Sequence, residues 1–188
     1  MINYPNMKTH QTKNNYSNKG MTLEHDIEKS NLFYLTEKIA CIYKKPTPVQ
    51  IVKVEFPARN KAKIVEAYYR SASTTDYNGV FQGHYIDFDA KEFSGATSFP
   101  LKNIEPHQIK HLNECSFHGG ITFLIVAWKK YGEYYLIPWK VINEIILSQE
   151  RQSLSYQLFK EKAYLIKEGF NPRLDYLKIV AEHLIEDK

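Results

Sequence analysis

The spacing of hydrophobic residues changes along this chain, and each spacing predicts an element. From residue 22 apolar side chains recur at helical intervals, which predicts a first helix with Leu23, Ile27 and Tyr34 on its buried face. A short apolar run at 39–43 then predicts a strand. The sequence Lys-Lys-Pro-Thr-Pro at 44–48 ends this strand, because neither proline can donate a hydrogen bond to a sheet.

The next segment predicts a ribbon of two strands. Residues 49–56 alternate apolar and charged side chains, which is typical of a strand with one solvent-exposed face. Residues 63–70 alternate again, and the connection between the two runs begins at Pro57 and is basic. We therefore expect a protruding basic ribbon over about residues 44–70, with a short helix over residues 61–67 as the alternative.

The remaining pattern predicts an α/β protein. Asn78-Gly79 is a strong hairpin signal, which places a turn between a strand ending near Tyr77 and a longer strand from Val80 to about Glu92. The apolar run 121–127 predicts a central strand covered on both faces. Further elements are a strand at 134–137 and three helices, which begin at Pro106, near Trp139 and near Pro172. The predicted fold is one mixed central β-sheet flanked by helices.

Composition places the protein among soluble single-domain proteins. The chain has 188 residues, and we interpret residues 21–188 as one domain. It has two cysteines and no apolar run of membrane-spanning length, so a disulfide scaffold and a membrane partner are both excluded. Residues 1–20 lack the apolar core of a signal peptide, which predicts a cytoplasmic protein.

The net charge of +4 is unevenly distributed. Residues 1–20 carry three lysines and no acidic residue, which predicts a disordered basic arm. Residues 44–70 carry seven basic residues against two acidic ones. This concentration favours a polyanionic partner, with a solvated, solubilising face as the alternative. The candidate nucleic-acid-binding residues are Lys44, Lys45, Arg59, Lys61, Lys63 and Arg70.

Candidate chemistry lies in residues 74–92. Because strand side chains alternate, Asp87, Asp89 and Lys91 should share one face while the apolar residues between them face the core. Asp76 lies on the preceding strand and can reach the face that carries Asp89. Two carboxylates can hold Mg²⁺, and a lysine can stabilise developing negative charge, as phosphodiester hydrolysis requires. The alternative is an ordinary exposed strand face with aspartate and lysine side chains.

Seven sequence blocks closely resemble the RecU-type Holliday junction resolvases, members of the PD-(D/E)xK nuclease superfamily. They run in order through nearly the whole chain: GMTLE at 20–24, KKPTPVQIV at 44–52, TTDYNGV at 74–80, YIDFDAKE at 85–92, TSFPL at 97–101, HQ at 107–108 and PRLDY at 172–176.

The resemblance implies a restriction-endonuclease-like nuclease fold, a homodimer and Mg²⁺-dependent symmetric nicking of four-way DNA junctions in homologous recombination and repair. Mn²⁺ is expected to substitute for Mg²⁺. Recombinase and branch-migration proteins are implied as further partners. Carried over by residue, the metal site comprises Thr74, Asp76, Asp89 and Gln108. The catalytic residues are Asp76, Asp89 and Lys91, the last as transition-state stabiliser.

Some assignments stay open. Glu24 resembles an outer metal ligand of related nucleases, with a solvated helix-surface glutamate as the alternative. The family usually has Glu where this chain has Asp89, so we expect activity with an altered metal preference. Two other functions remain: a non-catalytic DNA-binding or recombination scaffold protein, and a restriction-type DNA endonuclease.

Two nearby side chains have ordinary interpretations. His107 and His111 have zinc-site spacing, but Gln108 stands where a zinc protease has glutamate, which favours surface or DNA-facing histidines. Cys115 is interpreted as a packing residue on the inner side of its helix.

Overall fold

A six-stranded mixed sheet forms the centre of the protein. The computed structural model describes residues 22–59, 61–69 and 74–185, so the predicted arm at residues 1–20 and Arg70 lie outside the described residues. Among the strand pairs that the structure describes in this sheet, only β5–β7 is parallel, which confirms the predicted mixed sheet. In spatial order the strands are β1 (Ala40–Lys44), β4 (Tyr77–Phe81), β5 (His84–Phe93), β7 (Ile121–Trp128), β8 (Glu133–Pro138) and β10 (Tyr164–Leu165).

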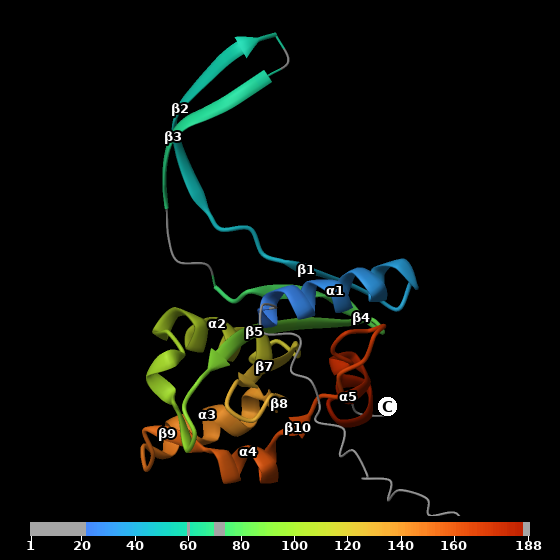
Figure 1. The fold of residues 1–188 in the computed structure, drawn as a ribbon. Helices are drawn as coiled ribbons and strands as arrows, with labels where there is room; N and C mark the ends of the chain where they lie inside the picture. The colour runs from blue at the N-terminus through green and yellow to red at the C-terminus, as the bar shows by residue number, and fades with distance from the viewer. Residues whose placement is uncertain (1–21, 60, 70–73, 186–188) are drawn as a thin grey trace, which may run out of the picture.

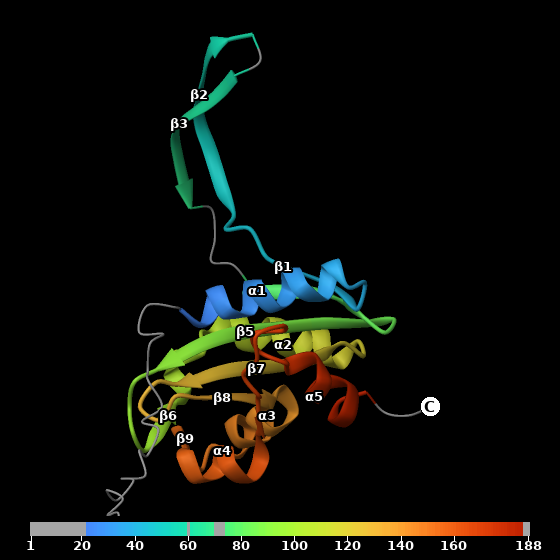
Figure 2. The ribbon, with the colours of Figure 1, turned by 45° about the vertical axis from the view of Figure 1, so that its right-hand side comes forward.

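Helices cover both faces of this sheet (Figure 1, Figure 2). Side chains of α1 (Leu23–Thr36) and α5 (Tyr176–His183) pack in one apolar cluster. Side chains of α2 (Pro106–Phe117), α3 (Trp139–Ser148) and α4 (Tyr156–Lys162) pack in a second cluster on the opposite face. The remaining elements are short: β6 (Ser98–Pro100), β9 (Ser153–Ser155) and the 3-10 turn η1 (Leu101–Asn103).

Strand β7 contributes to both apolar clusters, as its sequence predicts. Phe123 and Ile125 pack with α1 and α5, whereas Leu124 and Val126 pack on the side of α2 and α3. β5 runs beside it and buries Phe88 in the first cluster. Its residues of opposite parity therefore face α2, and this parity sets the position of the candidate site.

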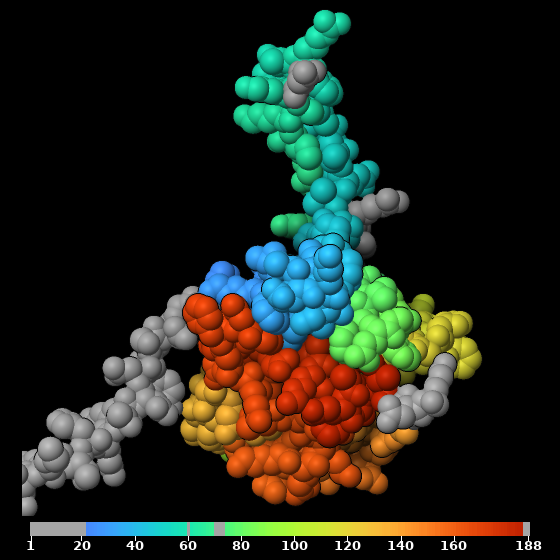
Figure 3. Space-filling view, turned by 90° about the vertical axis from the view of Figure 1, so that its right-hand side faces the viewer, coloured from blue at the N-terminus to red at the C-terminus, as the bar shows by residue number. Residues whose placement is uncertain are grey.

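The ribbon stands apart from the body (Figure 1, Figure 3). β2 (Val49–Ala58) and β3 (Lys61–Tyr69) pair only with each other, and β3 is a strand over the segment for which a helix was the alternative. The expectation of one buried face is wrong, because none of the elements in the described part of the chain packs as a second layer on the ribbon. Apolar side chains are exposed along both strands: Val49, Ile51, Val52, Phe56, Ile64, Val65, Tyr68 and Tyr69.

The predicted hairpin turn at Asn78-Gly79 is also wrong. Both residues lie inside β4, and the chain turns at Gln82 and Gly83, which have φ angles of 48° and 80°. Gly79 is needed for close packing, since a Cβ atom there would lie 2.0 Å from the carbonyl oxygen of Cys41 in β1. The sequence signal therefore marked a close approach of two strands instead of a turn.

The first helix begins as predicted, whereas the part of the chain after α3 agrees less closely with the prediction. Thr22 accepts a hydrogen bond from the His25 amide and caps α1. The last helix begins at Tyr176, four residues after the predicted start at Pro172. The segment containing β9, α4 and β10 was not predicted. No helix among the described residues is long and apolar enough to cross a membrane.

Candidate active site

The register of β4 and β5 brings two predicted carboxylates together. Tyr77 pairs with Phe88, so the next residues outward, Asp76 and Asp89, are neighbours across the two strands. Asp76 Oδ2 accepts a hydrogen bond of 3.0 Å from the backbone N–H of Ala90, which fixes this carboxylate against β5. The Asp89 side chain is fully buried. The structure thus brings Asp76 and Asp89 together, although through a different hairpin from the one predicted.

Asp89 is held from two sides. Lys91 Nζ lies 2.8 Å from Asp89 Oδ2. Gln108, on the first turn of α2, donates from Nε2 to Asp89 Oδ1 at 2.8 Å, and its Oε1 accepts from Lys91 Nζ at 3.0 Å. The three side chains form a closed triangle between β5 and α2. This arrangement confines the Lys91 ammonium beside the carboxylate pair.

Gln108 is itself fixed by the way α2 begins. Its Oε1 accepts from the backbone N–H of Glu105, while the Glu105 side chain accepts from the Gln108 backbone, as in a capping box. Pro106 occupies the first turn, where no intrahelical donor is needed. The local sequence that starts the helix therefore also orients the amide that contacts Asp89.

The carboxylate pair carries a repulsion that Lys91 offsets only in part. Burial and the neighbouring Asp76 carboxylate, against the opposing effect of Lys91, together raise the pKa of Asp89 to about 7. Among the described residues, Asp89 Oδ2 has no well-aligned hydrogen-bond donor, although Lys91 Nζ is close. A buried carboxylate oxygen that has an ion-pair partner but no hydrogen-bond donor in the described part of the chain, beside a second carboxylate, suits a hard divalent cation. Asp76 and Asp89 thus fit the metal that the sequence predicts.

Thr74 and Glu24 contact lysine side chains outside this pair. Thr74 is exposed and its hydroxyl accepts a hydrogen bond of 3.1 Å from Lys45 Nζ. Glu24 forms an ion pair of 2.6 Å with Lys44 on the surface of α1. Gln108 directs its amide nitrogen toward Asp89, so a role as oxygen ligand requires the amide to turn.

The predicted nucleic-acid-binding residues divide into two groups. Arg59, Lys61 and Lys63 are exposed at the tip of the ribbon. Lys45 is mostly buried against the body, and its Nζ lies 2.7 Å from Asp87 Oδ2. Lys44 is engaged by acidic side chains of α1. The tip residues are therefore the cations most available to a partner within this set.

Sequence reasoning gave no role to Asp87, which is the centre of a second polar network. Its carboxylate accepts hydrogen bonds from Thr75 and from the Tyr85 hydroxyl, and its Oδ2 contacts Lys45 and His111 Nε2. The strand parity that selected Asp89 also selects Asp87, and the helical spacing of Gln108 and His111 places both on the side of α2 that faces β5. The strand parity and the helical spacing together were the sequence signal that could have identified this network.

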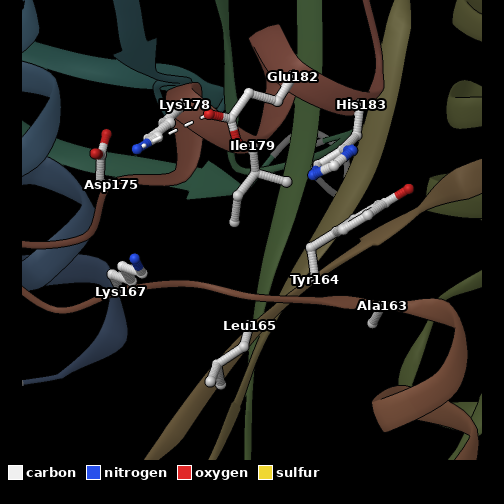
Figure 4. A pocket seen from close by; sticks show the side chains of 9 residues that line it. All are labelled: Ala163, Tyr164, Leu165, Lys167, Asp175, Lys178, Ile179, Glu182 and His183. Carbon is white, nitrogen blue, oxygen red and sulfur yellow. Dashed lines mark ion pairs between the residues drawn. The ribbon is translucent and has the colours of Figure 1, made fainter.

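A separate cavity of about 310 Å³ lies between β10 and α5 (Figure 4). Its residues come from other elements than the carboxylate pair. Tyr164 stacks on His183 with ring centroids 4.2 Å apart, and Lys178 pairs with Glu182 along α5. The predicted chemistry therefore lies elsewhere, at the junction of β4, β5 and α2.

The sequence comparisons with known proteins cover most of the chain. The family model described as "Recombination protein U" matches residues 18–182. A Lactobacillus acidophilus protein named Holliday junction resolvase RecU is 48% identical over 180 residues, which cover 96% of this chain and 85% of that protein. A protein of the same name from Bacillus mycoides is 45% identical, with 95% of this chain and 96% of that protein covered. The solved structure of the Archaeoglobus fulgidus resolvase Hjc is 9% identical, with a TM-score of 0.40 over 72% of this chain and 90% of that chain.

Proposed function

The chain belongs to the RecU family, recombination protein U, and from this premise we propose that it is an endonuclease that resolves four-way DNA junctions in homologous recombination and repair. The observation that carries the proposal is the pairing of Asp76 with the buried Asp89, with Lys91 held beside them. We assign Asp76 and Asp89 as the ligands of a divalent cation, Mg²⁺ with Mn²⁺ as substitute.

When bound, the cation supplies polarisation of the scissile phosphate and acidification of a water molecule. The protein's own residues supply position and charge. Lys91 extends from the same strand face as Asp89 and presents a cation where negative charge grows on the phosphate. Gln108 holds both side chains in place and is first a positioning residue. Thr74 and Glu24 are proposed as peripheral contributors to the same site.

We propose that the ribbon selects the branched substrate. A cation that contacts phosphate adds affinity for any DNA, so shape selectivity needs a protruding element that fits a branch point. The ribbon carries Arg59, Lys61 and Lys63 at its tip and is separated from the body (Figure 1). Its placement suits insertion into the open centre of a junction.

A homodimer is the second part of this proposal. Phe56 and Tyr69 on the ribbon have 72% and 81% of their surfaces exposed to solvent. Such a concentration of exposed apolar side chains is unusual for a monomer and is typical of a surface that contacts another protein. A twofold dimer presents one metal site to each of two related strands, as symmetric nicking requires. Recombinase and branch-migration proteins are proposed as further partners.

The test compares four substrates at equal concentration: a labelled four-way junction, matched duplex, single strand and a three-way branch. We expect cleavage of the four-way junction with Mg²⁺ or Mn²⁺ and none with EDTA. Ca²⁺ should allow binding with little cleavage, because its larger and looser coordination misplaces the attacking water.

Two results would contradict the proposal. If the protein bound the junction but did not cleave it with any divalent metal, it would instead act as a non-catalytic recombination scaffold protein. Equal cleavage of duplex at a fixed sequence would indicate a restriction-type endonuclease.

A further inference from the structure

A second group of side chains of the types that bind metals lies between β5 and α2 and does not include the carboxylate pair. One oxygen of Asp87, a ring nitrogen of His111 and the sulfur of Cys115 all lie within 4.8 Å of one another. His111 and Cys115 are one helical turn apart on α2, so both project toward β5 from the same helix face. Cys115 Sγ lies 3.4 Å from His111 Nε2, and that nitrogen lies 2.9 Å from Asp87 Oδ2.

We propose that Asp87, His111 and Cys115 form a binding site for a thiophilic divalent cation of the Zn²⁺ class. A carboxylate, an imidazole and a thiolate are the donor types that zinc accepts, and three protein ligands leave a fourth position open. Two atoms bonded to one tetrahedral ion at about 2.0–2.3 Å lie roughly 3.3–3.6 Å apart. The 3.4 Å between Cys115 Sγ and His111 Nε2 matches this separation, and the 2.9 Å between His111 Nε2 and Asp87 Oδ2 is a few tenths of an ångström shorter. The site is distinct from Asp76 and Asp89, whose donors are all oxygen.

The present contacts of His111 support this assignment. Nε2 lies 2.9 Å from the acceptor Asp87 Oδ2 and 3.2 Å from the donor Lys45 Nζ. One nitrogen cannot donate to the carboxylate and accept from the ammonium at once. Lys45 thus already places a cation against two of the three donor atoms. A metal ion in this position would satisfy the carboxylate, the imidazole and the sulfur together, and the lysine would be displaced.

The site is accessible from solvent. His111 and Cys115 line an open cavity of about 570 Å³ between α2 and the β4–β5 turn. The same cavity is lined by His84, Glu114 and His118, which offer further donors near its mouth. An incoming ion therefore meets imidazole and carboxylate groups before it reaches the buried Asp87.

Binding requires the thiol to lose its proton. Burial raises the pKa of Cys115, and the nearby Asp87 raises it further, so the metal-free residue is a neutral thiol. The ion takes the thiolate and releases one proton to solvent. The resulting bonds would join β5 to α2, the two elements that carry Asp89 and Gln108. The expected consequence is a clamp on the scaffold of the candidate active site.

Co²⁺ is the probe that identifies the ligands, because a bond between cobalt and sulfur gives a charge-transfer band in the near ultraviolet. We expect this band when the metal-free, reduced protein is titrated with Co²⁺, and its loss when Zn²⁺ is added. Cys115→Ser should weaken Co²⁺ binding at least about tenfold and abolish the band. Cys41→Ser is the matched control, since it changes the other cysteine, which is exposed on β1.

A second variant separates this site from the proposed catalytic one. Asp76→Asn should retain the cobalt band, whatever it does to DNA cleavage, so failure of one proposal is distinguishable from failure of the other. Zn²⁺ should raise the melting temperature of the wild type in excess Mg²⁺ but not that of Cys115→Ser. The proposal is overturned if the wild type gives no band, if Cys115→Ser keeps it, or if Asp76→Asn abolishes it.

Discussion

Asp89 should make the metal-free protein less stable as the pH rises. Its pKa is raised to about 7 in the folded protein from 3.8 in an ordinary carboxyl group, so the folded state binds this proton more tightly than the unfolded state. Above the unfolded pKa the folded protein therefore loses relative stability until the pH passes the folded pKa. The destabilisation is absent below about pH 4 and complete above about pH 7.

The magnitude follows from the shift. A single proton bound only by the folded state gives a slope of at most about 1.4 kcal/mol per pH unit. Between pH 5 and 8 the loss assigned to Asp89 is then about 1–3 kcal/mol, once relaxation of the carboxylate pair and partial compensation by Lys91 are allowed for. Asp89→Asn removes the titration and relieves the repulsion with Asp76.

Urea unfolding in EDTA at pH 5, 6, 7 and 8 measures this difference. The free energy of unfolding of the wild type should fall relative to Asp89→Asn as the pH rises, because other titrating groups are common to both proteins. Saturating Mg²⁺ should restore the wild type at pH 8 and leave Asp89→Asn unchanged. If the free energies of unfolding of the two proteins changed with pH in parallel, the raised pKa of Asp89 would not be the cause of the pH dependence.

The other predictions concern chemistry, substrate choice and packing. Lys91→Ala should slow junction cleavage on the order of a hundredfold or more while junction affinity, measured by gel shift, stays unchanged; a proportional loss of binding would contradict its role. Joint replacement of the ribbon-tip cations by alanine (Arg59→Ala, Lys61→Ala and Lys63→Ala) should weaken junction binding more than duplex binding. Equal losses of the two affinities would mean that the ribbon contacts phosphates without selecting the junction. Gly79→Ala should cost about 1–3 kcal/mol of stability because its Cβ meets the β1 backbone. Gly83→Ala, in open space at positive φ, is the matched control and should cost about 1 kcal/mol; equal losses would contradict the close-packing explanation.

The spacing of hydrophobic residues predicted the helices and strands that bury one or both of their faces. β7 was recognisable because its residues supply both apolar clusters. α1 was recognisable because Leu23, Ile27 and Tyr34 recur at helical spacing, although polar side chains share its buried face. The turn predicted at Asn78-Gly79 was wrong because this dipeptide occurs both in turns and where two strands lie very close together. The close contact with β1 that requires glycine here is not visible in the sequence. The segment from β9 to β10 is built from very short elements whose length is set by their neighbours, so local pattern carries little signal there.

The candidate site was predictable in its residues but not in its contacts. Strand parity placed Asp89 and Lys91 on one face, and the sequence blocks supplied Gln108. The direction of the Gln108 amide depends on the capping box at Glu105 and on Lys91, neither of which spacing reveals. The network of Asp87 with Lys45 and His111 joins three segments distant in sequence, so it emerges only once β5 and α2 are packed.

Single-turnover cleavage of a labelled four-way junction by Asp89→Asn tests the proposed metal-dependent site most directly. The protein is held in excess so that all junction is bound, and the rate is compared with that of the wild type in Mg²⁺. We expect the variant to bind the junction normally and to cleave it on the order of a hundredfold or more slowly, because one anionic ligand is lost. Cleavage at the wild-type rate by fully bound Asp89→Asn would contradict the assignment of Asp76 and Asp89 as the metal-binding pair.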